Sequence, residues 1–141
     1  SPLCNAMLYL MWLERPLDVL PLVCGELQEN EAEALARHIG LATASRPRTL
    51  FITATDIVSQ RSIEDATGLS DWIVPAIEDM EAGLLYGIAP ESAASVDVAV
   101  TFAKEREADY AKVLLYRTTE DVQPNAAAVD GYLSAVFYRN K

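Results

Sequence analysis

A continuous stretch of 42 residues, from Ser62 to Ala103, carries eight carboxylates and no lysine, arginine or histidine. It contains most of the net charge of −10, because the residues on either side are close to balanced. The fold has to place these carboxylates in water, since an unpaired buried charge is costly. A surface this negative repels phosphate backbones and attracts cations or basic protein surfaces. The eight acids are Glu64, Asp65, Asp71, Glu78, Asp79, Glu81, Glu91 and Asp97.

Apolar residues in the same stretch recur at steps of four, three and four, the spacing of the buried stripe of an amphipathic helix. They are Ile73, Ile77, Met80 and Leu84. Ser70 is a suitable N-cap for this helix. Pro75 instead favours a start near Val74, which places the proline in the first turn. Residues 62–85 are therefore predicted to form two helices that are interrupted at Gly68.

Three of the acids lie on a different face of the second predicted helix. Asp71, Glu78 and Glu81 are seven and three residues apart, a spacing that keeps them together and away from the apolar stripe. We expect this acidic face to bind a basic surface of a partner protein. The same carboxylates are candidate ligands for Mg²⁺ or Ca²⁺, but a solvated acidic face is the simpler interpretation. No metal site and no cofactor are predicted.

The length of 141 residues is suited to a single domain covering residues 1–141. No apolar run is long enough to span a membrane. Cys4 and Cys24 form no metal-binding spacing, and a reducing, cytoplasmic setting is expected. The sequence Asn5-Ala6-Met7 resembles a vector junction, so residues 1–6 are expected to be vector-derived.

The remaining pattern predicts an α+β fold, with an N-terminal helical region and a small, mainly antiparallel sheet. The helical region runs from Pro16 to about His38, and Gly40 is its expected C-terminal cap. Strands are predicted at residues 49–57, 96–102 and 113–117. The second of these rests on the alternation of Val96, Val98, Val100 and Phe102 with smaller or polar residues. Residues 131–139 fit either a strand or a helix.

The centre of the chain also resembles the winged helix-turn-helix of bacterial regulators. The resemblance rests on the Gly68-Leu69-Ser70 turn and on the Glu81-Ala82-Gly83-Leu84 step. It implies a wing in which residues 84–88 pair with residues 96–102. The recognition helix would carry acids where DNA readers place cations, which disfavours nucleic acid as a partner. Under this alternative, Arg46, Arg48 and Arg61 are the predicted nucleic-acid contacts.

Three functions follow from these observations. The favoured one is a non-catalytic regulatory or protein-interaction module that presents its acidic face to a basic partner. This module is expected to form a homodimer through the apolar segment from Met7 to Leu13. The second is an atypical winged-helix transcription regulator, and the third is a small enzyme with a carboxylate metal site. No catalytic residue is predicted, since His38 is interpreted as a cation at a helix end.

Overall fold

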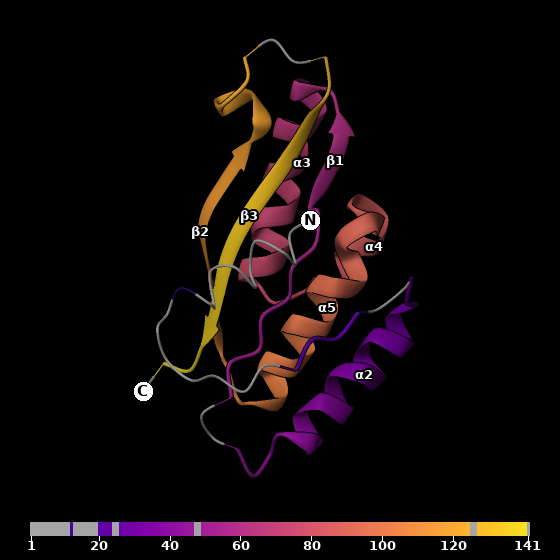
Figure 1. Ribbon diagram of the computed structural model, residues 1–141, viewed down its shortest axis with the longest axis vertical. Coiled ribbons are helices and arrows are strands. Elements are labelled where there is room, and N and C mark those ends of the chain that lie inside the picture. Colours follow the sequence, from indigo (N-terminus) through magenta and orange to yellow (C-terminus); the bar gives the residue numbers. More distant parts are fainter. Residues whose placement is uncertain (1–11, 13–19, 24–25, 47–48, 125–126, 141) are drawn as a thin grey trace.

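The computed structural model describes residues 12, 20–23, 26–46, 49–124 and 127–140 (Figure 1). Its helices are α2 (Glu29–Ala42), α3 (Ile63–Glu78), α4 (Leu85–Ile88) and α5 (Pro90–Glu105). Its strands are β1 (Val58–Arg61), β2 (Tyr110–Thr118) and β3 (Val129–Tyr138), and short 3-10 turns cover Ala82–Leu84 and Thr119–Asp121. This arrangement confirms the predicted α+β class. None of the helices in the described ranges has the length and apolar character needed to cross a membrane.

The sheet has three strands in the order β1-β3-β2, and both strand pairs are antiparallel. β2 and β3 form a long ribbon from the Tyr110–Tyr138 pair to the Thr118–Gly131 pair. A bulge between Val113 and Leu115 shifts the register within β2. Figure 1 shows the helices on one side of this ribbon. β2 includes the strand predicted at residues 113–117, and β3 shows that residues 131–139 are mainly strand.

The main hydrophobic core lies between the helices and the inner face of the sheet. Its largest fully buried side chains are Val58, Ile73, Ile77, Leu85, Val100 and Val129. The inward residues of β2 and β3 pack against this core, among them Val113, Tyr116 and Phe137. Tyr116 also donates a hydrogen bond of 2.8 Å from its hydroxyl to the Ala66 carbonyl, which ties α3 to β2.

The strand predicted at residues 96–102 is wrong, because these residues lie in the middle of α5. α5 is buried on two sides, and each side carries its own helical stripe. Val96 and Val100 face the main core, whereas Val98 and Phe102 belong to a second cluster that includes Ala32 and Ala36 of α2. The two stripes are offset by two residues, so together they imitate the alternation of a half-buried strand.

The strand predicted at residues 49–57 is also wrong, since this segment pairs with no strand and β1 begins at Val58. The segment runs along α5 instead. The Thr53 hydroxyl donates to the Ser95 carbonyl at 3.2 Å, and the buried Ser92 hydroxyl donates to the Ile57 carbonyl at 3.3 Å. Its β-branched and aromatic residues pack on a helix, a use that strand propensity does not distinguish.

The helix break predicted at Gly68 is absent, because α3 runs without interruption from Ile63 to Glu78. Ser62 caps α3 by accepting the Asp65 N–H at 3.1 Å, so the predicted starts at Ser70 and Val74 are wrong. Pro75 lies inside the last turns, where its missing N–H removes one bond to the carbonyl of Asp71. The wing implied by the winged-helix resemblance does not form, since residues 85–88 and 96–102 are helical and Leu84 lies in a 3-10 turn.

The N-terminal helical region is shorter than predicted. Residues 20–23 and 26–28 are not helical, and α2 begins at Glu29 with a capping box between Gln28 and Glu31. Gly40 lies inside α2 rather than at its cap, which is Thr43. Gly40 faces α5, where a Cβ at this position would make an ordinary van der Waals contact with Cβ of Glu105 at 3.5 Å. The start predicted at Pro16 falls outside the described residues.

Candidate functional site

A groove of about 470 Å³ lies beside the N-terminal half of α3. Three elements form it, namely the end of β1, the exposed side of α3 and the end of α4. Its lining combines one cation, two carboxylates, an indole ring and two aliphatic side chains. The lining residues are Arg61, Glu64, Asp65, Gly68, Leu69, Trp72 and Ile88.

The uninterrupted course of α3 creates this groove. Asp65, Gly68 and Trp72 are three and four residues apart, so an unbroken helix places them along one side. Trp72 is 68% exposed although it is a large aromatic residue. Gly68 contributes open space to the groove, since a Cβ at this position would meet no atom within 4 Å apart from its chain neighbours and the backbone of α3.

The charged residues around the groove differ in whether they have an ion-pair partner. The guanidinium of Arg61 lies 3.8 Å from a carboxylate oxygen of Glu91, which partly neutralises the one cation in the lining. Glu64 and Asp65 lie in the first turn of α3, where the helix dipole favours negative charge. In the part of the chain that the structure describes, no lysine or arginine forms an ion pair with either of them. The two carboxylates are therefore available to a cation from outside.

The three residues of the predicted acidic face lie in different settings. Asp71 is exposed on α3, and Glu81 is exposed beyond the end of that helix. Glu78 is half-buried, accepts the N–H of Val113 at 3.0 Å and lies 3.0 Å from Nζ of Lys112. The hydrogen bond from Lys112, followed by that from Val113, lowers the pKa of Glu78. Glu78 therefore holds the end of α3 to β2, and the role of the other two in binding stays a prediction.

The predicted nucleic-acid contacts are divided between separate elements. Arg61 ends β1 and lines the groove, whereas Arg46 follows the C-terminal end of α2. The Arg46 carbonyl accepts hydrogen bonds from the Thr49 hydroxyl at 2.7 Å and from Arg106 at 3.2 Å. Arg48 lies outside the described residues.

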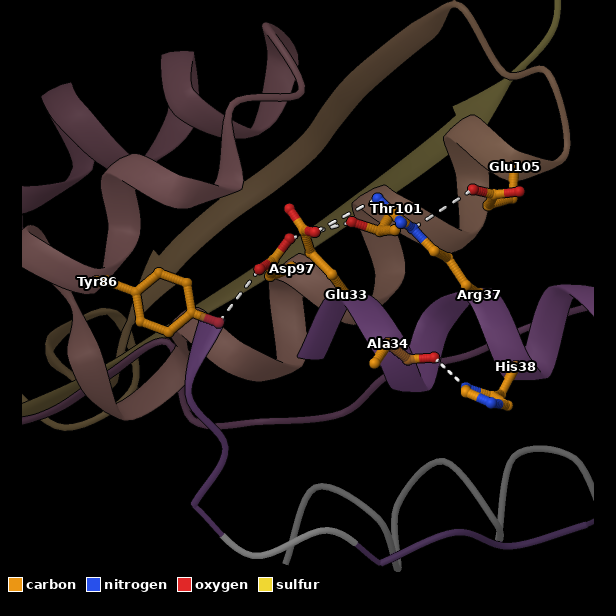
Figure 2. Close-up of polar contacts among 8 residues, drawn as sticks. All are labelled: Glu33, Ala34, Arg37, His38, Tyr86, Asp97, Thr101 and Glu105. Atoms are coloured by element: carbon orange, nitrogen blue, oxygen red, sulfur yellow. Dashed lines mark hydrogen bonds and ion pairs between the residues drawn. The ribbon is translucent and has the colours of Figure 1, made fainter. Parts of the chain in front are cut away.

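Two further predictions concern the N-terminal segment and the single histidine. Of the segment from Met7 to Leu13, the structure describes Trp12, which is almost fully exposed, and the other residues lie outside the description. His38 is exposed near the end of α2, where its Nδ1 donates to the Ala34 carbonyl at 2.6 Å (Figure 2). α2 continues to Ala42, so His38 precedes the last turn, and its interpretation as a cation at a helix end stays a prediction.

A buried carboxylate lies at the contact between α2 and α5. Asp97 is 6% exposed and accepts hydrogen bonds from the hydroxyls of Tyr86 and Thr101, each at 3.2 Å. Figure 2 shows Glu33 and Arg37 of α2 facing this part of α5. Arg37 lies 3.4 Å from Glu33 and 3.9 Å from Glu105, so it connects acids on both helices.

Burial raises the pKa of the Asp97 carboxyl, and the nearby charge of Glu33 raises it further. The hydrogen bonds from Tyr86 and Thr101 act in the opposite direction because they stabilise the carboxylate. Burial and the charge of Asp97 also raise the pKa of the Tyr86 hydroxyl, which is held as a neutral donor. Both shifts disfavour charge at this contact.

Within the described residues, no group of three or more histidine, cysteine, aspartate or glutamate side chains converges in a way that would hold a metal ion. Sequence reasoning missed the groove because Gly68 was interpreted as a helix break. With an unbroken helix, the spacing of Asp65, Gly68 and Trp72 would have indicated it. It also missed the burial of Asp97, since the assumed strand placed this residue on the polar side.

The comparisons with known proteins give one distant relative. No family model and no solved structure matches the chain. In a match 136 positions long that covers 92% of this chain, the chain is 25% identical to a protein of Thermotoga maritima described as a MEMO1 family protein. The match covers 48% of that protein, so the chain spans about half the length of the curated relative it matches. The description of this relative names no ligand, substrate or partner.

Proposed function

We propose that this protein is a non-catalytic interaction module that binds a basic segment of a partner protein in the groove beside α3. The observation that carries the proposal is a groove of about 470 Å³ lined by an exposed indole, Trp72, and by two carboxylates that form no ion pair with the described lysines and arginines. A groove of this size lies within the range that holds a small ligand or a few side chains. The proposal keeps the basic partner expected from the sequence, but it assigns the contact to Glu64 and Asp65 in place of the predicted face of Asp71, Glu78 and Glu81.

The chemistry of the groove is complementary to an arginine or lysine side chain. A cation that lies over the face of a tryptophan gains about 0.5–2 kcal/mol, depending on how far it is desolvated. Glu64 and Asp65 supply carboxylate oxygens for charge-assisted hydrogen bonds, which a guanidinium can form in pairs. Leu69 and Ile88 supply an apolar wall for the methylene groups of the same side chain.

The charge of the whole chain supports the same partner. A net charge of −10 attracts a basic segment from a distance and increases its association rate at low ionic strength. Arg61 opposes a cation in the groove only weakly, because Glu91 is its ion-pair partner. Binding should therefore weaken as salt is added, since exposed charges are screened.

The test is a titration of the protein into fluorescein-labelled peptides, one rich in arginine and one of the same length rich in glutamate. We expect the arginine peptide to bind and the glutamate peptide to remain free. Trp72→Ala should weaken binding about 2- to 30-fold, the equivalent of the cation–ring energy. The double change Glu64→Gln with Asp65→Asn should weaken binding and reduce its dependence on salt.

Asp71→Asn is the matched control, because it removes an exposed acid from the same helix outside the groove lining. It should bind nearly as the unmodified protein does. Circular dichroism confirms that each variant is folded, which we expect because all the altered side chains are exposed. Equal binding of both peptides, or unchanged affinity in the Trp72 and Glu64/Asp65 variants, would contradict the proposal.

A further inference from the structure

The side chains on the outer face of the β2–β3 ribbon are exposed, and most of them are aromatic or aliphatic. Alternate residues of both strands pack inward on the core, so their neighbours form the opposite face. This outer face contains the cross-strand pairs Tyr110–Tyr138, Lys112–Val136, Leu115–Ser134 and Arg117–Tyr132. All eight residues are exposed in the structure. The helices of the described chain lie on the other side of the ribbon (Figure 1).

The outer face differs in charge from the rest of the molecule. None of its eight positions carries a carboxylate, although the chain has 21 acidic residues and 11 basic ones. Its two cations, Lys112 and Arg117, are paired with Glu78 and Asp121 of the same chain. It is therefore a nearly neutral, aromatic surface on a strongly acidic protein. Two copies can meet here without the carboxylate repulsion that opposes contact through the acidic helices.

The edge of the ribbon is less suited to such a contact than its face. β2 is an edge strand, which offers main-chain groups to another strand. Glu78 occupies the N–H of Val113 at 3.0 Å, and the bulge between Val113 and Leu115 breaks the regular spacing of the strand. Bulges and charged groups are devices that prevent edge-to-edge pairing. Face-to-face packing leaves both in place.

From these observations we infer that the outer face of the β2–β3 ribbon binds the same face of a second copy of this chain. A symmetric contact of this kind uses one patch twice and closes as a dimer. Sheets that pack face to face interdigitate their side chains about 10 Å apart. The outward side chains offer on the order of 500 Å² per copy, below the roughly 800 Å² per partner of a standard interface. The dimer is accordingly a weak one, formed at micromolar concentrations.

Sedimentation velocity across micromolar to submillimolar concentrations tests the inference. The unmodified protein should shift from monomer to dimer as its concentration rises. Val136→Asp places a carboxylate in the centre of the outer face and should raise the dissociation constant of the dimer at least about tenfold. Val122→Asp is the matched control, since Val122 is 87% exposed and lies in the connection after β2, outside the paired residues of that face. It should dimerise as the unmodified protein does.

Ser134→Asp provides a second variant at an exposed polar position, in case Val136→Asp unfolds the sheet. A protein that stays monomeric at every concentration would overturn the inference. Dimers that persist in both face variants would overturn it as well, because they would assign the contact to another surface. Trp72→Ala should leave dimerisation unchanged, because it alters the groove and not the outer face. The proposed dimer and the proposed peptide binding can therefore be disproved independently.

Discussion

The two hydrophobic clusters on either side of α5 differ in how many buried side chains they contain and in how many elements contribute them. The main core combines isoleucine, leucine and valine side chains from α3, α4, α5, β1 and β3, for example Ile73 and Val58. The smaller α2 cluster packs Ala32 and Ala36 against Val98 and Phe102. Since apolar area removed from water sets most of the stabilisation, the main core holds its elements far more strongly than the α2 cluster holds α2.

Polar contacts compensate for part of this difference at the α2 cluster. Arg106 donates to the carbonyls of Thr43 and Arg46 at 3.0 and 3.2 Å, which ties the end of α2 to α5. Phe51 lies against Phe102 with ring centroids 4.8 Å apart. The two Arg106 hydrogen bonds are only partly buried, so water competes for them, whereas the contact between Phe51 and the buried Phe102 is apolar. We therefore expect α2 to open locally while the main core stays folded.

The largest expected effects come from one substitution in each cluster. Ile73→Ala removes a fully buried side chain and should lower the free energy of unfolding by about 2–5 kcal/mol. Phe102→Ala should instead reduce hydrogen-exchange protection of the α2 amides and shift the urea midpoint less. The loss in the global free energy of unfolding cannot exceed the free energy that holds α2 on the rest of the fold. Urea titration and amide hydrogen exchange measure the two quantities.

If Phe102→Ala lowers hydrogen-exchange protection equally in α2 and in β3, the independent opening of α2 is contradicted. That outcome would show that α2 and the main core unfold as one unit. Val122→Asp serves as the reference for a surface change that touches neither cluster.

A smaller effect is expected from the carboxylate at the α2 contact. The raised pKa of Asp97 means that the folded protein binds its proton more tightly than a carboxyl in water does, with burial as the main cause and the charge of Glu33 in α2 as a further one. The contribution of Asp97 to α2 docking is therefore fully present below its ordinary pKa of 3.8 and is lost as the pH rises through the raised pKa. Tyr86→Phe removes a donor to the carboxylate and should lower the free energy of unfolding by about 1–3 kcal/mol at neutral pH.

Hydrogen exchange of the α2 amides over a pH series, corrected for intrinsic rates, measures this dependence. Asp97→Asn should abolish the pH dependence of α2 opening, whereas Tyr86→Phe should extend it to higher pH. Two carboxylates of the sheet region depend on pH in the opposite direction. The pKa of Glu78 is lowered by Lys112 and Val113, and that of Asp130 in β3 is lowered by the Gln60 N–H that it accepts at 2.9 Å, so both stabilise the fold above their ordinary values of 4.5 and 3.8. Exchange measured at the α2 amides separates the contribution of Asp97 from theirs. An α2 protection that is independent of pH in the unmodified protein would contradict the assignment.

How far the sequence predicts this structure depends on how many sides of each element are buried. The β2 strand was predicted correctly because one of its faces packs on the core and the other is open. α5 was misassigned because both of its sides are buried, so its polar face is too narrow to give a period of 3.6 residues. Tertiary packing, not local propensity, decided its conformation.

The candidate groove could not be predicted from the sequence for a related reason. Gly68 and Pro75 are both ordinary signals of a helix end, but packing of Ala66, Ile73 and Ile77 on the main core carries α3 past them. The acidic residues near the groove were recognised as a surface feature. Their position beside Trp72 was not predicted, since it requires the unbroken helix and the nearby end of α4.

Gly68→Ala gives the smallest effect and the sharpest test of the independence of α2. An alanine at this position enters open space and removes the helix penalty of glycine, which should stabilise α3 by about 0.5–1 kcal/mol. Because α3 belongs to the main core, amides that exchange only through global unfolding should gain this protection. The α2 amides should gain none, since their opening leaves α3 folded in both proteins. Equal gains in α2 and β3, measured by hydrogen exchange, would show that the two clusters open together.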